Sequence, residues 1–164
     1  MTDKIITQEY LQSIFEYKDG ELYWKNSLSY CTKIGDKTGS ISSTGYKVTF
    51  INKKSYKNHR LIFLFHKGYL PKILDHIDGN PLNNHIENLR EATHQQNCQN
   101  RSKQKNNNSG YKNIAWIKSE KRWKVKINSN NKSYYLGMYK DLELAILVAE
   151  MAREKYHKEF AVHK

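Results

Sequence analysis

Cysteine, proline and long apolar runs are scarce in this 164-residue chain, which has two cysteines and two prolines. Cys31 and Cys98 form no CxxC pair, which argues against a disulfide framework or an all-cysteine zinc site. The longest apolar runs, 61–65 and 145–149, are too short to cross a bilayer. The N-terminus lacks the basic and apolar segments of a signal peptide. These absences predict a soluble, cytoplasmic protein that binds no zinc.

Acidic residues are also few, with 16 Asp and Glu against 28 Lys and Arg, a formal net charge of +12. The excess is concentrated in residues 101–133, which hold ten Lys or Arg against Glu120 alone. Such a run is often only a solvated face. Here it is interleaved with Tyr111, Trp116 and Trp123, which suits phosphate contact beside stacking or packing. The charge therefore favours nucleic acid over a membrane surface as the partner.

Periodicity predicts an α+β fold in the first hundred residues. Helices are expected over 8–15 and 58–66, and short strands over 21–24, 46–51, 55–57, 73–77 and 89–92. Thr93 and Gln96 have the spacing of a capping box, so a further helix should begin there and carry Asn97 in its opening turns.

A second, smaller module is predicted near the C-terminus. Residues 101–109 contain no apolar residue and are expected to form a basic linker between domains 1–100 and 110–164. After the linker, residues 123–127 alternate between apolar and cationic side chains, as an amphipathic strand does, and 134–136 should form another strand. Asp141 should cap a helix with an apolar stripe formed by Leu142, Ala145, Ala149, Ala152 and Tyr156.

The residues most suggestive of chemistry are Asp75, His76, Asn88 and Asn97. Phosphodiester cleavage needs a nucleophile, charge neutralisation at the phosphate and help for the leaving oxygen. In a strand–strand–helix arrangement, the Asn97 amide could lie beside the Asp75 carboxylate, and two hard oxygen ligands suit Mg²⁺. His76 could accept a proton from the attacking water, because imidazole titrates near neutrality. An Asp-His pair beside a turn is, however, more often an ordinary surface loop.

The whole string DHIDGNPLNNHIENLREATHQQN, residues 75–97, resembles the HNH endonucleases of phages and mobile introns. The resemblance extends over about residues 10–101 and implies a β-β-α active site that binds one divalent cation, Mg²⁺ or Mn²⁺. It implies that His76 is the general base and that Asp75 and Asn97 bind the metal. Asn88 would brace the loop, and the role of His85 stays open. Many relatives carry structural zinc between cysteine pairs, which this chain lacks.

Residues 109–161 resemble a second family, the APETALA-type DNA-binding domain of plant ethylene-response factors. That family lays a three-stranded sheet in the DNA major groove, with a helix behind the sheet. The resemblance implies DNA contacts from six residues: Lys112, Asn113, Lys124, Lys126, Asn128 and Tyr135. Ala115 and Ile117 stand where the plant domains have arginines, so bidentate reading of guanine is not expected there.

The sequence thus predicts an endonuclease that nicks or cuts double-stranded DNA and needs no small-molecule cofactor. Two alternatives stay open. The chain could be a DNA-binding protein that does not cleave, with an HNH region that only positions the duplex. The basic linker alone would also suit an RNA-binding accessory protein.

Overall fold

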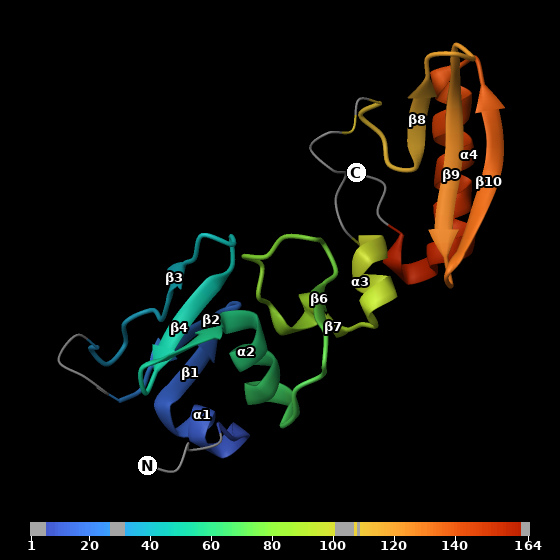
Figure 1. The fold of residues 1–164 in the computed structure, drawn as a ribbon. Helices are drawn as coiled ribbons and strands as arrows, with labels where there is room; N and C mark the ends of the chain where they lie inside the picture. The colour runs from blue at the N-terminus through green and yellow to red at the C-terminus, as the bar shows by residue number, and fades with distance from the viewer. Residues whose placement is uncertain (1–5, 27–31, 101–106, 108, 162–164) are drawn as a thin grey trace. The chain divides into compact units, whose positions relative to one another are not determined.

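The fold is described from a computed structural model, which covers residues 6–26, 32–100, 107 and 109–161. Contacts within the chain divide it into two compact units, Met1–Glu91 and Ala92–Lys164 (Figure 1). The domain limits predicted from the sequence, 1–100 and 110–164, stay a prediction, and most of the expected linker lies outside the described residues.

The first unit begins with a short helix that leads into a hairpin. Helix α1 (Gln8–Ile14) starts at Thr7, whose hydroxyl accepts a hydrogen bond from the Tyr10 amide. The chain then forms the antiparallel strands β1 (Phe15–Lys18) and β2 (Glu21–Trp24). Asp19 and Gly20 both have positive φ, 49° and 78°, as a two-residue hairpin turn of the mirror-image type requires.

A three-stranded antiparallel sheet follows, in the order β3 (Ser40–Ile41), β4 (Lys47–Ile51), β5 (Lys54–Lys57). Asn52 and Lys53, both with positive φ, make the turn between β4 and β5. Helix α2 (Asn58–Lys67) comes directly after β5 and ends at Gly68, which has a left-handed conformation and donates its N–H to the Leu64 carbonyl.

The last part of this unit is a pair of very short antiparallel strands, β6 (Leu74–His76) and β7 (Leu89–Glu91). A loop that ends in the 3-10 turn η1 (Ile86–Asn88) connects them.

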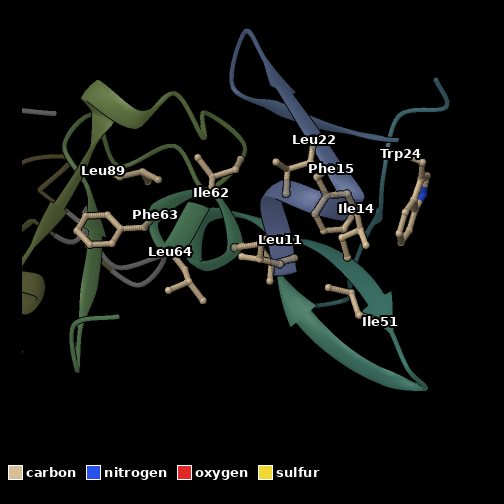
Figure 2. Close-up of a cluster of buried hydrophobic side chains, with 11 residues drawn as sticks. Leu11, Ile14, Phe15, Leu22, Trp24, Ile51, Ile62, Phe63, Leu64 and Leu89 are labelled. Carbon is tan, nitrogen blue, oxygen red and sulfur yellow. The ribbon is translucent and has the colours of Figure 1, made fainter. Parts of the chain in front are cut away.

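One apolar cluster holds the elements of the first unit together. Its members come from both helices and from β1, β2, β4 and β7: Leu11, Ile14, Phe15, Leu22, Trp24, Ile51, Leu61, Ile62, Phe63, Leu64 and Leu89. In the view of Figure 2, Phe63 and Leu89 lie at one end of the cluster and Trp24 and Ile51 at the other. Helix α2 therefore joins the strand pair β6–β7 to the rest of the unit through its buried face.

The second unit starts with helix α3 (His94–Asn100). Its capping box is confirmed: the Thr93 amide donates to the Gln96 side chain at 2.7 Å, and the Gln96 amide donates to the Thr93 hydroxyl at 3.2 Å. Strands β8 (Ile114–Ile117), β9 (Arg122–Ser129) and β10 (Lys132–Tyr139) then form an antiparallel sheet in the order β10–β9–β8.

Helix α4 (Leu142–His157) packs along this sheet and is followed by the 3-10 turn η2 (Lys158–Phe160) (Figure 1). The Asp141 carboxylate caps the helix by accepting the Glu143 amide at 2.9 Å, as predicted. Ala145 and Ala149 of α4 meet Ile114 and Val125 of the sheet in a small core. The small alanine side chains let the helix lie close to the sheet.

The α+β fold class is confirmed. The predicted helices and the predicted strands of the first unit lie within one or two residues of their predicted bounds, whereas β9 and β10 extend up to two and three residues beyond theirs. Strands β1 and β3 were not predicted, and no residue range was predicted for β8. Strand β3 has only two residues, which is too short for an alternation of apolar and polar side chains to be recognised.

The apolar cluster of the first unit predicts the effect of two isoleucine substitutions. Ile62 is fully buried in α2, and Ile41 is 64% exposed on β3. Ile62→Ala should lower the free energy of unfolding by about 2–5 kcal/mol, because it removes buried methyl groups and leaves a cavity. The matched change Ile41→Ala should cost less than about 0.5 kcal/mol. Urea denaturation of the full chain measures both, and equal losses would contradict the described core.

Candidate active site

The strand pair β6–β7 positions the first two candidate residues. Asp75 lies opposite Arg90, and His76 lies opposite Leu89. Successive side chains of a strand point to opposite faces, so Asp75 and His76 belong to different faces of this ribbon. Both residues are 6% exposed, which is unusual for ionisable side chains unless they have partners.

His76 is enclosed by the loop on one side and by aromatic rings on another. Its Nε2 lies 3.0 Å from the Oδ1 of Asn84, a side chain that is itself 1% exposed. The ring of His59 meets the His76 ring edge-on, with 5.0 Å between centroids, and the Tyr46 ring lies 6.2 Å away. Asn84 Oδ1 can accept a hydrogen bond from Nε2, and in that pairing Nδ1 carries the lone pair.

His59 is the neighbour that helix α2 contributes. Burial, followed by the nearby His76, Lys57 and Arg60, lowers the pKa of His59 to about 3. His59 is therefore neutral at pH 7 and adds no positive charge beside His76. Its ring also packs against Tyr46 at 5.2 Å, and the Lys57 ammonium lies over the Tyr46 ring at 4.1 Å from the centroid.

Asp75 is held on the other face by an ion pair. The Nε and Nη2 atoms of Arg90 donate to Asp75 Oδ2 at 3.2 and 3.1 Å. The two residues are cross-strand partners, so the register of β6 and β7 creates this contact. The carboxyl group is thus buried and oriented by a guanidinium group.

A network of amide side chains fixes the loop between β6 and β7. The Asn88 side chain accepts the Asp78 amide at 3.1 Å, and its Nδ2 donates to Asp78 Oδ1 and to the Asn83 carbonyl. Asp78 also accepts the Asn80 amide and the Asn83 side chain. Burial alone would raise the pKa of Asp78, but the hydrogen bonds from Asn80, Asn88 and Asn83 outweigh burial and lower it.

The hairpin β1–β2 supports the same loop from outside. Tyr17 accepts the Ile86 amide through its hydroxyl at 3.2 Å. Gly20 lies against His85: a Cβ at Gly20 would come within 3.0 Å of the His85 ring, and Gly20 has a φ of 78°. Glycine is therefore required at this turn both by conformation and by close approach. His85, whose role the sequence left open, packs here against the hairpin.

Asn97, the last residue of the predicted set, is half-buried in the opening turns of α3. It belongs to the second unit, whereas Asp75, His76 and Asn88 belong to the first. The structure thus brings Asp75, His76 and Asn88 onto one strand–loop–strand element. Among the described residues, no three His, Cys, Asp or Glu side chains gather closely enough to hold a metal ion.

The predicted DNA-contacting residues all lie in the second unit. Lys124, Lys126 and Asn128 share one face of β9, opposite the buried Val125 and Ile127. Cross-strand pairing puts Tyr135, 59% exposed, beside Lys126 on this outer face. Lys112 and Asn113 precede β8, where the Asn113 carbonyl accepts the Lys126 amide.

None of the helices in the described segments has the length and hydropathy of a membrane-spanning segment.

The sequence of the chain is similar to a known protein family and to two viral proteins. A family model described as HNH endonuclease matches residues 56–99. Protein 3.8 of Escherichia phage T7 is 33% identical over 118 residues, which is 66% of this chain and 97% of that protein. An uncharacterized HNH endonuclease of Acanthamoeba polyphaga mimivirus is 33% identical over 124 residues, 74% of this chain and 63% of its own length. No solved structure shows a significant match.

The chain belongs to the HNH endonuclease family, and this membership implies a DNA nuclease. The matched residues 56–99 include β6, β7, their loop and helix α2.

Sequence reasoning did not single out three side chains around the site: His59, Asn84 and Arg90. Asn84 lies in an Asn-rich segment, and such segments usually form turns. Arg90 could have been proposed from register, because a basic residue opposite a buried acidic one is a common cross-strand pair. The segment His59-Arg60-Leu61 resembles the lead-in of the family motif, but no local pattern predicts that His59 meets His76, because this contact arises from the packing of α2.

The loop network predicts the effect of truncating Asn88. Asn88→Ala removes three side-chain hydrogen bonds, each worth about 0.5–1.5 kcal/mol net, so the Asp78 amide should exchange with solvent at least about tenfold faster. Asn80→Ala is the matched control, because its side chain accepts only the Leu82 amide among the described contacts. Hydrogen exchange of the full chain measures both. Equal Asp78 exchange in the two variants would show that Asn88 does not hold the loop.

Proposed function

We propose that this protein is a metal-dependent endonuclease that hydrolyses phosphodiester bonds in double-stranded DNA, as a nick or a double-strand cut. The observation that carries this proposal concerns two neighbouring residues of β6, Asp75 and His76. His76 is buried and held at Nε2 by Asn84 of the loop, and Asp75 is paired with Arg90. A surface loop with an accidental Asp-His pair would not need a buried amide acceptor and a cross-strand guanidinium to position its two side chains.

In this proposal His76 is the general base. Nε2–H donates to Asn84, so Nδ1 is the nitrogen that takes a proton from the attacking water. Asn84 then acts as a positioning residue, because it sets both the ring orientation and the tautomer. The neutral His59 favours this role, since a second positive charge at 5.0 Å would oppose protonation of His76.

Asp75 and Asn97 would hold one Mg²⁺ or Mn²⁺. The donor set fits these ions, because carboxylate and amide oxygens are the hard ligands that they prefer, and Mg²⁺ keeps several waters. Such a metal would neutralise charge that develops on the phosphate and the leaving oxygen. Arg90 orients the Asp75 carboxylate for this task. Asn97 is assigned from its position in the motif, and Asn88 is assigned as the residue that braces the loop. Zinc is not part of the proposal.

The second unit would bind DNA through the outer face of its sheet, as an APETALA-type domain does. The strand order, the helix behind the sheet and the outward Lys124 and Lys126 support this assignment. Ala115 pairs with Lys124 on the same face, and its methyl group cannot read a base by hydrogen bonds. The module should therefore supply affinity more than sequence discrimination, since lysine engages phosphate mainly as a point charge.

A plasmid assay tests the proposed cleavage. The full chain should nick or linearise supercoiled DNA with Mg²⁺ and should lose this activity with EDTA. His76→Ala should lower the cleavage rate by about 10²–10⁴-fold, because the general base is lost, while DNA affinity changes little. The matched control is His66→Ala, an exposed histidine of α2 in the same unit.

Two outcomes would contradict the proposal. Cleavage by His76→Ala at the wild-type rate would remove the histidine from catalysis. DNA binding by the wild-type chain without any Mg²⁺-dependent cleavage would favour the alternative, a DNA-binding protein that does not cut.

A further inference from the structure

A polar cavity of about 600 Å³ lies within the second unit. It lies between the residues just before β8 and the turn that connects β9 to β10. Its described lining includes two lysines, a histidine and several amide side chains but no carboxylate: Lys112, Lys132, His157, Gln95, Asn113 and Asn128. A cavity with this lining suits an anion that also has hydrogen-bonding groups nearby.

His157 is the clearest sign that the cavity has a ligand. The residue ends α4 and is 6% exposed, and its Nε2 lies 3.0 Å from the Asn128 carbonyl. Within the described part of the chain its Nδ1 is buried without a hydrogen-bond partner. A buried polar nitrogen without a partner costs about 1–3 kcal/mol, so an external group that bonds to it would be favoured.

Two cationic side chains, Lys112 and Arg153, lie near His157. Arg153 of α4 is 2% exposed and donates through Nη1 to the Lys112 carbonyl at 3.1 Å. Arg153 Nη2 lies 3.8 Å from the carboxylate of Glu150, whose side chain is 40% exposed. Burial, and then Arg153, lower the pKa of Lys112 to about 8. Cationic groups held this close repel one another, and a bound anion would offset the repulsion.

We propose that this cavity binds a phosphate group of the DNA backbone, with Lys112 and Lys132 as its donors. His157, whose Nε2–H donates to the Asn128 carbonyl, lines the cavity as a hydrogen-bond acceptor at Nδ1 for a base amino group of the same nucleotide. The proposal rests on the proposed function of the second unit as a DNA-binding module, and it adds a specific anchor beside the outer face of the sheet. The cavity, at about 600 Å³, is larger than a single phosphate group. Asn113 and Asn128 are thus placed to contact the sugar or base edge of the same nucleotide.

The first test compares exposed lysines of equal charge in the full chain. Lys132 lines the cavity, and Lys140, just after β10, does not. Lys132→Ala should weaken binding to a duplex about tenfold at 0.1 M salt and make the log–log salt slope shallower by about one unit, because one phosphate contact is lost. Lys140→Ala should leave the slope unchanged. Equal effects of the two changes would overturn the proposal in favour of general charge attraction.

The second test needs no variant that could unfold. Side-chain NMR signals of His157 are followed in the full chain while inorganic phosphate, and separately a short duplex, is added. Both additions should shift the His157 signals, with the duplex acting at a much lower concentration. A duplex that binds without shifting them would contradict the cavity as a phosphate site.

These outcomes are separable from the nuclease assignment. A chain that cleaves plasmid but shows no His157 response and no difference between Lys132→Ala and Lys140→Ala would refute the cavity alone. A chain that shows the His157 response with the duplex but never cleaves would refute the nuclease and retain the phosphate site.

Discussion

The hydrogen bond between His76 and Asn84 is the contact on which the proposed chemistry depends. A histidine on a three-residue strand has little local structure to hold it, and among the described strands β6 pairs only with β7. The ring is instead fixed from outside, by Asn84 at Nε2 and by the His59 and Tyr46 rings. Because the neutral imidazole has one donor and one acceptor nitrogen, a single acceptor at Nε2 decides which nitrogen can act as a base.

Much of the first unit serves to keep Asn84 in place. Asn88 and Asp78 tie the loop on either side of it, and the β1–β2 hairpin contacts the loop through Tyr17 and Gly20. Helix α2 contacts both the core and the site: its apolar face packs into the core, and His59 near its start packs against His76. This arrangement gives a physical reason for the β-rich segment that precedes the motif. That segment positions the loop by packing.

Charge is divided between the two units in a way that fits the proposed division of work. In the first unit the buried carboxylate of Asp75 is paired with Arg90. The second carries most of the excess positive charge, on the outer face of its sheet and around the cavity near His157. Attraction to phosphate is long-ranged and tolerant of sequence, whereas general-base catalysis needs atoms placed within a few tenths of an ångström.

Local patterns in the sequence were enough to predict the helices, the longer strands, the α3 capping box and the Asp141 cap, since each depends on residues a few positions apart. The motif also identified Asp75, His76 and Asn88. The surroundings of the site were not predictable in this way. His59 lies 17 positions before His76, and Arg90 lies 15 after Asp75, and both contacts arise from helix packing or strand register. The cavity near His157 likewise joins segments that no motif connects.

The most direct test of this account is the tautomer of His76 in the full chain, read from the nitrogen chemical shifts and long-range proton couplings of its imidazole at neutral pH. The account predicts a proton on Nε2, with Nδ1 in the form that carries the lone pair, and a loss of this preference in Asn84→Ala. A proton on Nδ1 in the wild-type chain, or an unchanged tautomer without the Asn84 amide, would contradict the role given to Asn84 and the base assigned at Nδ1.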